Sequence, residues 1–205
     1  MSTLVVIAKE CVPGRVKTRL YPEFTWEQAA DIASASLAVT LDTVRRYAVD
    51  RRILYLEGDA AAVPHEGFDV IPQARGALDE RLAAVFDMLD EPTLLIGMDT
   101  PQLRTSQLRW PDRTDAVIGL AEDGGFWALG MREPRGDVIR GIPMSRPDTG
   151  ARQRAALTTA RMSVDDLDVM RDVDLPADAR AVARAIPGSA FARAVASARR
   201  QRGAE

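Results

Sequence analysis

Three basic side chains follow the first apolar segment of the sequence. Residues 3–9 (TLVVIAK) have the composition of a buried strand, and the next segment contains Pro13 and Gly14 ahead of Arg15, Lys17 and Arg19. Glycine lets a backbone approach a ligand closely, Arg can bind a phosphate through two hydrogen bonds, and Lys adds a compact charge. The pattern predicts a polyphosphate site without the spacing of a Walker A loop. A solvated basic loop explains the composition equally well.

A carboxylate ends the most apolar strand candidate. Asp99 lies in GMDTP, directly after the run PTLLI, and Pro101 turns the chain soon after it. A carboxylate at such a position is costly unless it is paired or binds a cation. Proteins usually hold Mg²⁺ through one or two carboxylates together with phosphate oxygens of the substrate. We therefore predict that Asp99 is a metal ligand. The alternative is that Asp99 caps a helix that begins after Pro101.

Two later acidic segments offer partners for Asp99. The first, EDGGFW, contains Asp123, Gly124 and Gly125, which suit either a hairpin turn or close contact with a flat ligand. The second, RDVDLPADA, contains Asp172 and Asp174 ahead of a helix candidate, where Asp and Pro are favoured anyway. We expect Asp99 and Asp174 to share one cation, with Asp123 or Asp172 as the alternative partner of Asp99.

Strand and helix candidates alternate along the chain. The strand candidates are residues 3–9, 51–58, 68–73, 92–99, 115–121 and 125–132. The helix candidates are residues 25–47, 77–90, 104–110, 151–160, 175–186 and 189–203, with Thr25 and Gln28 spaced as in a capping box. This alternation predicts an open, mostly parallel α/β sheet. Ligands of such sheets bind beyond the carboxyl ends of the strands, where the segments above are expected.

Composition narrows the class of protein. The 205 residues fit one domain, and their net charge of -3 gives no broad basic surface for nucleic acid. Cys11 and His65 are the single residues of their types, which argues against a zinc site, a disulfide within the chain and histidine-based catalysis. Because no apolar run has the length of a membrane span or a signal-peptide core, we expect a cytoplasmic protein that is not bound to a membrane.

Five segments occur in the order found in a known family. AKECVPGRVKTRL, PQARGALDERL, GMDTP, GLAEDGGFWALGM and DVDLPADA make residues 4–186 resemble a bacterial glycosyltransferase-A-like family of unproven activity. More widely, the chain is similar to nucleotide-diphospho-sugar transferases, including the molybdenum-cofactor and phospholactate guanylyltransferases. The resemblance implies a Rossmann-like α/β/α sandwich with a mixed sheet. Residues 1–205 would form a single nucleotide-binding transferase domain of GT-A type, and the last helix, 188–202, could lie at its periphery.

The residues and the resemblance together assign roles. The nucleotide-binding set comprises Pro13, Gly14, Arg15, Lys17, Arg19, Gln73, Asp123, Gly124 and Gly125. The catalytic residues are expected to be Lys17, Arg19 and Asp99, and the ligands of Mg²⁺ or Mn²⁺ to be Asp99 and Asp174.

The chain also departs from the family pattern. Ala77 and Asp79 stand where the family has Asp and Gly, so a family carboxylate is missing or displaced by two positions. Phe126 replaces a Tyr, and the segment IPMSRPDTG lacks a family Trp. These departures point to an altered acceptor pocket.

The basic side chains near the N-terminus and the predicted metal ion favour a transferase that acts on a phosphate-containing substrate. Such catalysis depends on positioning and charge neutralisation and needs no His or Cys. The favoured reaction is nucleotidyl transfer from a nucleoside triphosphate to a small acceptor that carries a phosphate or carboxylate. One alternative is a glycosyltransferase with a nucleotide-sugar donor. Another is a non-catalytic nucleotide-binding protein, which the changes at Ala77 and Phe126 would suit. The sequence leaves the nucleotide's base, the acceptor and the oligomeric state open.

Overall fold

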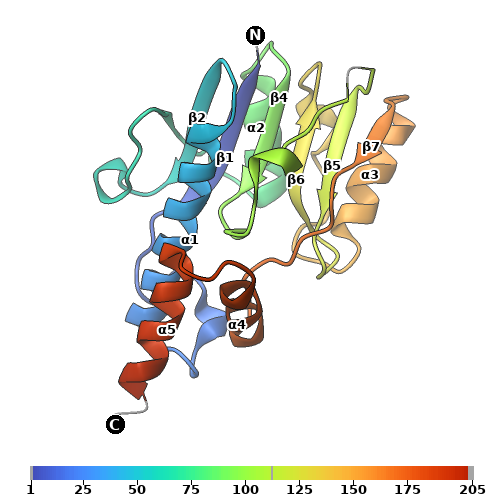
Figure 1. Ribbon diagram of the computed structural model, residues 1–205. Coiled ribbons are helices and arrows are strands. Elements are labelled where there is room, and N and C mark those ends of the chain that lie inside the picture. The colour runs from blue at the N-terminus through green and yellow to red at the C-terminus, as the bar shows by residue number, and fades with distance from the viewer. Residues whose placement is uncertain (1, 112, 203–205) are drawn as a thin grey trace.

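The chain folds around one mixed sheet. A computed structural model describes residues 2–111 and 113–202, and within them seven strands pair in the order β3-β2-β1-β4-β6-β5-β7 (Figure 1). The strands are β1 (Thr3–Lys9), β2 (Arg51–Glu57), β3 (Asp69–Pro72), β4 (Thr93–Gly97), β5 (Ala116–Leu120), β6 (Phe126–Met131) and β7 (Val164–Asp166). Strand β6 is antiparallel to both of its neighbours, and the other pairs are parallel. The predicted mixed, mostly parallel sheet is therefore confirmed.

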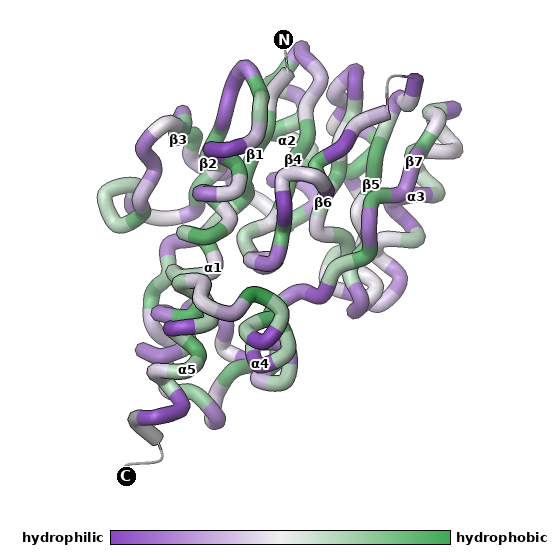
Figure 2. Tube along the Cα trace, in the orientation of Figure 1, coloured by the Kyte–Doolittle hydropathy of each residue, from purple (hydrophilic) through white to green (hydrophobic). Residues whose placement is uncertain are grey.

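Helices cover both faces of the sheet. On β1, Leu4 and Val6 belong to an apolar cluster with residues of α1 (Trp26–Arg46), whereas Val5 belongs to a cluster with α2 (Leu78–Asp87) and α3 (Thr149–Thr159). Successive residues of a strand point to opposite faces, so the sheet lies between α1 on one side and α2 and α3 on the other. Burial on both faces explains the continuous apolar strands, as the hydrophobic colour along β5 in Figure 2 illustrates.

Helix α1 begins as the sequence predicts and then reaches the end of β4. Thr25 Oγ1 accepts a hydrogen bond from the Gln28 N–H, and Gln28 Oε1 accepts one from the Thr25 N–H, which confirms the capping box. Further along α1, the buried Ser36 hydroxyl donates to the carbonyl oxygen of Met98 at 2.7 Å. The helix thus fixes the backbone immediately before Asp99.

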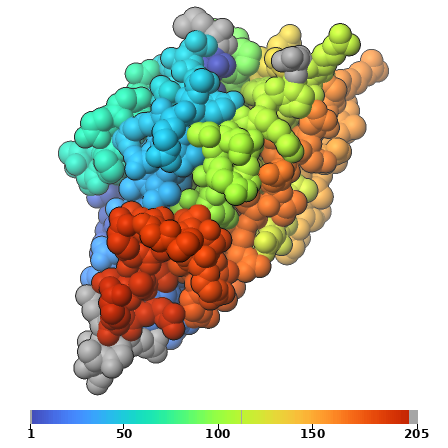
Figure 3. Space-filling model, viewed as in Figure 1, coloured from blue at the N-terminus to red at the C-terminus, as the bar shows by residue number. Residues whose placement is uncertain are grey.

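Two C-terminal helices extend the fold beyond the sheet. Helices α4 (Pro176–Ala185) and α5 (Ala190–Arg202) lie against the lower end of α1 (Figures 1 and 3). Phe24, Ile32, Val173, Val182 and Phe191 are among the buried residues of this contact. The predicted helix 189–203 is present as α5, which packs on α1 through Phe191, Val195 and Ala198, and residue 203 lies outside the described part of the chain.

Short elements differ from the sequence predictions. The expected helix 104–110 is a single 3-10 turn at Thr105–Gln107, and the mixed segment 161–169 contributes β7. Helix α3 begins at Thr149, two residues before the expected start, because Thr149 and Gly150 join the first turn. Among the described residues, no helix combines the length and apolar character needed to cross a bilayer.

Candidate active site

A cavity of about 640 Å³ opens beyond the carboxyl ends of β1 and β4. Most of the predicted site residues line it: Arg15, Lys17, Arg19, Gln73, Asp99, Asp123, Gly125 and Asp174. Pro13, Gly14 and Gly124 lie in the same turns but outside this lining. The sheet edge that the sequence predicts as the ligand site therefore carries the cavity, and its loops bring distant segments together.

Lys17 lies at the centre of the charged groups. Its Nζ is 2.8 Å from Asp99 Oδ1 and 2.9 Å from Asp174 Oδ1, and its side chain is only 7% exposed. Its backbone has a φ of 48°, in the left-handed region that few non-glycine residues adopt. Burial by itself would lower the pKa of Lys17, but the charges of Asp99 and Asp174 outweigh it and raise that pKa. The ammonium therefore stays charged.

A backbone hydrogen bond explains why Asp99 and Asp174 meet although 75 positions separate them. The N–H of Val173 donates to the carbonyl oxygen of Asp99 at 3.0 Å, and the Val173 side chain is buried against α1, α4 and α5. Asp174 follows directly and also contacts Arg19, whose Nη1 is 3.3 Å from Asp174 Oδ2. Burial pushes the pKa of Asp174 up, but Lys17 and Arg19 outweigh it and lower that pKa.

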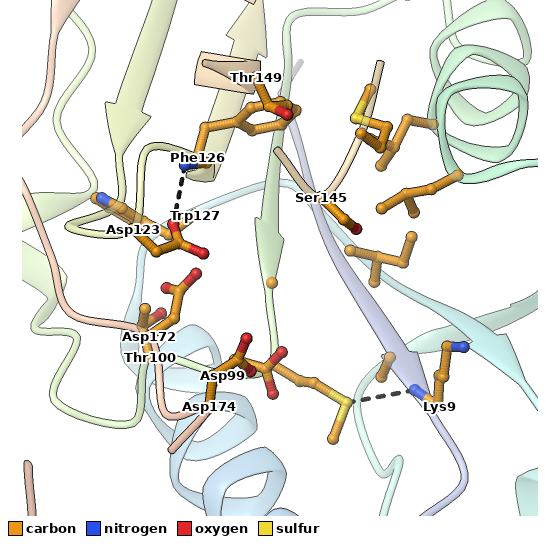
Figure 4. A pocket seen from close by; sticks show the side chains of 18 of the residues that line it. Lys9, Asp99, Thr100, Asp123, Phe126, Trp127, Ser145, Thr149, Asp172 and Asp174 are labelled. Carbon is orange, nitrogen blue, oxygen red and sulfur yellow. Dashed lines mark hydrogen bonds between the residues drawn. The ribbon is translucent and has the colours of Figure 1, made fainter. Parts of the chain in front are cut away.

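The carboxyl groups of four aspartates border the cavity. Figure 4 shows Asp123, Asp172, Asp99 and Asp174 along one side, with Thr100 beside Asp172. Asp172 Oδ1 and Thr100 Oγ1 are buried and have no hydrogen-bond partner among the described residues. Burial raises the pKa of Asp172 to about 7, and the negative charges of Asp99 and Asp123 add to this rise. These two oxygens therefore have unused capacity to accept a hydrogen bond or to bind a cation.

The predicted metal ligands are close together, but they do not form a complete metal site. Asp99 and Asp174 bind the same ammonium group of Lys17. Within the described part of the chain, no three His, Cys, Asp or Glu side chains are grouped closely enough to hold a metal ion. A cation here would need oxygen atoms from a substrate as well as from the protein.

The DGG segment is the turn between β5 and β6. Asp123 Oδ1 accepts a hydrogen bond from the Gly125 N–H at 2.8 Å. Gly124 has a φ of 90°, and a Cβ atom there would lie 1.9 Å from the carbonyl oxygen of Pro147. Gly124 is therefore needed for the contact with the segment before α3, whereas Asp123 and Gly125 face the cavity.

Two aromatic residues follow this turn and have different surroundings. Phe126 lines the cavity with its ring (Figure 4). Trp127 is buried, and its Nε1 donates to the carbonyl oxygen of Asp168 at 3.0 Å. Trp127 is thus mainly a core residue, and Phe126 lacks the hydroxyl that the related family has at this position.

Gln73 is held by protein groups at the ends of the strands. Its Nε2 donates to the carbonyl oxygens of Ala8 at 2.7 Å and Tyr55 at 3.0 Å, and its Oε1 accepts from Arg81 Nη1 at 2.8 Å. Arg81 Nη1 also contacts Glu57 Oε2 at 2.7 Å. Sequence reasoning missed Arg81, although it lies in the motif PQARGALDERL and lines the cavity.

The structure explains the departure at Ala77. This residue is the N-cap of α2, where its side chain makes no capping hydrogen bond, and only the Glu80 carboxylate accepts from its N–H. Asp79 Oδ2 accepts a hydrogen bond from the Gly141 N–H at 2.8 Å. A family Asp at position 77 would stand where helices favour an Asp cap, so its loss removes a cap.

The segment before α3 supplies a wall of the cavity. The sequence connects this segment, IPMSRPDTG, with the acceptor pocket but identifies none of its residues as site residues. Met144, Ser145, Arg146, Pro147 and Thr149 line the cavity, and Ser145 points into it from a backbone with a φ of 57° (Figure 4). The Thr149 hydroxyl donates to the carbonyl oxygen of Pro143 and fixes the turn. The sequence identified this stretch as a loop, but only the fold brings it to the sheet edge.

A family of bacterial proteins matches part of the chain. Residues 38–146, more than half of the chain, match a family described as "Uncharacterized protein conserved in bacteria (DUF2064)". The chain belongs to this family. No functionally curated protein matches the chain.

Several solved structures are also similar to this chain. The chain is 26% identical to a "putative nucleotide-diphospho-sugar transferase" from Desulfovibrio desulfuricans G20, with a TM-score of 0.84 over 98% of this chain and 95% of that one. Rv0371C of Mycobacterium tuberculosis H37Rv, in complex with manganese, is 22% identical with a TM-score of 0.52, over 90% of this chain and 98% of that one.

A third similar structure is a CMP:2-keto-3-deoxy-manno-octonic acid synthetase in complex with CTP. It is 13% identical with a TM-score of 0.51, over 88% of this chain and 96% of that one. The predicted fold of nucleotide-diphospho-sugar transferases is thereby confirmed for this member of the bacterial family. The comparisons also support the predicted enzyme class, a transferase.

Proposed function

We propose that the cavity binds a nucleoside triphosphate and transfers its nucleotidyl group to a small acceptor that carries a phosphate or carboxylate. The observation that carries this proposal is the charged cluster around Lys17. A permanently charged ammonium and the exposed Arg15 and Arg19 lie beside several carboxylates at the carboxyl edge of the sheet. Such an edge is where ligands of open α/β sheets bind.

In this reaction an acceptor oxygen bonds to the α-phosphorus, the bond from that phosphorus to the bridging oxygen breaks, and pyrophosphate leaves. Arg15 and Arg19 can bind phosphate oxygens through paired N–H groups. Lys17 supplies a positive charge where negative charge develops on the phosphoryl oxygens. None of these steps needs Cys11, whose pKa is raised to about 11 by burial and by the charge of Asp99.

The donor atoms around the cavity fit Mg²⁺ or Mn²⁺. They are carboxylate and hydroxyl oxygens, and Asp172 Oδ1 and Thr100 Oγ1 have no partner among the described residues. Asp99 and Asp174 would hold the ion if the Lys17 ammonium moves off them, and Asp99 with Asp172 is the alternative pair. When bound, the ion would neutralise the charge of the phosphates.

Glycosyl transfer from a nucleotide-sugar is the second candidate. The D. desulfuricans structure favours it, because that protein is described as a "putative nucleotide-diphospho-sugar transferase". Its TM-score is the highest of the three similar structures named above. Such a donor carries two phosphates rather than three. The cluster of Arg15, Lys17 and Arg19 suits the larger charge better, which is why we favour the triphosphate.

Product analysis distinguishes the two reactions. The purified protein is incubated with Mg²⁺ or Mn²⁺, each nucleoside triphosphate and pools of small phosphorylated or carboxylated acceptors, and released pyrophosphate is measured. A parallel set contains nucleotide-sugars, and released nucleoside diphosphate is measured. We expect acceptor-dependent pyrophosphate release. Diphosphate release from a nucleotide-sugar would instead identify a glycosyltransferase, and nucleotide binding without either product would indicate a non-catalytic protein.

A further inference from the structure

Arg81 lines the cavity, and the Nε atom of its guanidinium group has no hydrogen-bond partner among the described residues. The residue lies in the second turn of α2 and is 16% exposed at its side chain. Both of its hydrogen bonds to described residues come from Nη1, at 2.7 Å to Glu57 Oε2 and 2.8 Å to Gln73 Oε1. Its Nε is buried and has no partner in the described part of the chain.

An unpaired guanidinium edge has a specific chemistry. The N–H bonds of Nε and Nη2 point in the same direction, and their spacing matches two oxygens of one carboxylate or phosphate. A buried donor without a partner is also unfavourable, so native proteins usually pair such groups. An oxyanion that enters the cavity would supply the missing acceptors.

Neither Glu57 nor Gln73 depends on Arg81 as its sole partner. Glu57 already has another cation, because Lys9 Nζ lies 3.2 Å from the same Oε2 atom. Gln73 is anchored by its two bonds to backbone carbonyl oxygens without help from Arg81. Glu57 and Gln73 therefore orient the guanidinium through Nη1 and leave Nε without a partner, at a residue that lines the cavity.

The neighbours of Arg81 indicate which substrate it contacts. The cations of the β1–α1 loop, Arg15, Lys17 and Arg19, lie on a different segment and can bind the phosphates of the nucleotide. Arg81 shares α2 with Leu78 and Leu82, whose apolar side chains line the same cavity. A ligand group here would combine an oxyanion with an adjoining hydrocarbon portion.

We propose that Arg81 binds the carboxylate or phosphate of the acceptor through its Nε edge, and that Glu57 and Gln73 act as positioning residues. The inference rests on the proposed function, since it assigns the acceptor of that transfer to a class: small organic acids or phosphate esters with an apolar carbon skeleton. The shared chemistry is a group with two oxygen acceptors.

Nitrogen-edited NMR of arginine side chains tests this binding directly. The Nε–H signal of Arg81 is assigned by its loss in Arg81→Lys, which keeps a positive charge near Glu57 but lacks the second edge. Acetate and inorganic phosphate are then titrated into the free protein and into protein with Mg²⁺ and a non-hydrolysable triphosphate analogue. We expect a saturable shift of this signal in both forms.

The variants separate binding from folding. Arg154→Lys is the matched control, because Arg154 pairs with Asp166 on the exposed side of α3, outside the cavity lining. We expect oxyanion affinity to fall about tenfold or more in Arg81→Lys and to stay unchanged in Arg154→Lys. Glu57→Gln leaves Arg81 in place, and we expect it to shift the Nε–H signal and weaken oxyanion binding several-fold, without loss of thermal stability.

Several results would overturn the proposal. One is an Nε–H signal that neither acetate nor phosphate moves, and this remains measurable even if Arg81→Lys does not fold. A tenfold loss of triphosphate affinity in Arg81→Lys would assign Arg81 to the donor phosphates, and a loss confined to one base would assign it to base recognition. If no nucleotide binds but acetate still shifts the signal, the proposed function fails while the oxyanion site stands.

Discussion

Two sets of polar side chains in the cavity satisfy their hydrogen bonds in opposite ways. The paired set is Lys17, Asp99 and Asp174, in which one buried ammonium contacts two carboxylates. The unpaired set is Thr100, Asp172 and Arg81, each with a buried polar atom that has no partner among the described residues. Buried polar groups in native proteins normally have partners, so the unpaired set calls for an explanation.

The difference separates what the fold needs from what a ligand needs. In the paired set, the charges that we propose to bind the ligand also hold the β1–α1 loop to the segment before α4. Changes there should reduce stability and binding together. In the unpaired set, the atoms without a partner gain nothing from folding. A change confined to such an atom should therefore reduce binding and leave stability unchanged or higher, as often found at functional sites.

Loss of the central ammonium should have the largest effect. Lys17→Met removes the ammonium between Asp99 and Asp174 and leaves only the exposed Arg19 beside Asp174. A fully buried pair loses about 3–5 kcal/mol when one partner is removed. These carboxylates are 39% and 37% exposed, so solvent screening should reduce the loss of unfolding free energy to roughly 1–3 kcal/mol. Chemical denaturation measures it.

The paired set also gives a control for this variant. Arg19→Ala removes a cation that is 68% exposed, so we expect weaker triphosphate binding with little change in stability. If the double variant Lys17→Met/Asp174→Asn is no more stable than Lys17→Met, charge repulsion is not the cause of the loss.

The unpaired set should respond in the opposite direction. Thr100→Val replaces a buried hydroxyl with a methyl group of similar shape, at a residue with 0% exposure. We expect unfolding free energy to rise by up to about 1 kcal/mol, because an unpaired hydroxyl no longer has to be buried. Triphosphate affinity in the presence of Mg²⁺ should fall. A clear loss of stability would show that this hydroxyl is paired in solution and would remove Thr100 from the unpaired set.

The smallest effect should come from a residue in neither set. Ala77→Asp restores the family side chain at the N-cap of α2, and we expect a gain of about 0.5–1 kcal/mol in unfolding free energy. Nucleotide affinity should not change, because the position caps a helix. A large change in affinity without a change in stability would mean that the family carboxylate acts on the ligand.

The sequence predicts the elements and most of the loops, because these depend on local patterns. Thr25 and Gln28 mark the start of α1 by their spacing, and the apolar run before Asp99 indicates a central strand. The loops after β1 and β4 follow from the rule that ligands bind at the carboxyl edge. These patterns were enough to bring Lys17 and Asp99 to one site.

Other parts of the site depend on contacts that no local pattern encodes. The Val173–Asp99 backbone bond places Asp174 on Lys17, and nothing in the sequence indicates that the ammonium would take the position expected for a cation. The sequence suggests Gly124 as a ligand contact. In the structure, the absence of a side chain at Gly124 makes room for the carbonyl oxygen of Pro147. Ser145 reaches the cavity only because the segment before α3 folds over that turn.

Metal-dependent nucleotide binding is the central claim, and calorimetry of the wild-type protein and Asp99→Asn tests it most directly. Each protein is titrated with the triphosphate that binds best, with and without Mg²⁺. In a separate titration, Mn²⁺ is added without nucleotide. We expect Mg²⁺ to strengthen wild-type binding about tenfold or more, Mn²⁺ alone to bind weakly, and Asp99→Asn to stay folded without the Mg²⁺ effect. An equal Mg²⁺ effect in both proteins, or no nucleotide binding by the wild type, would contradict the claim.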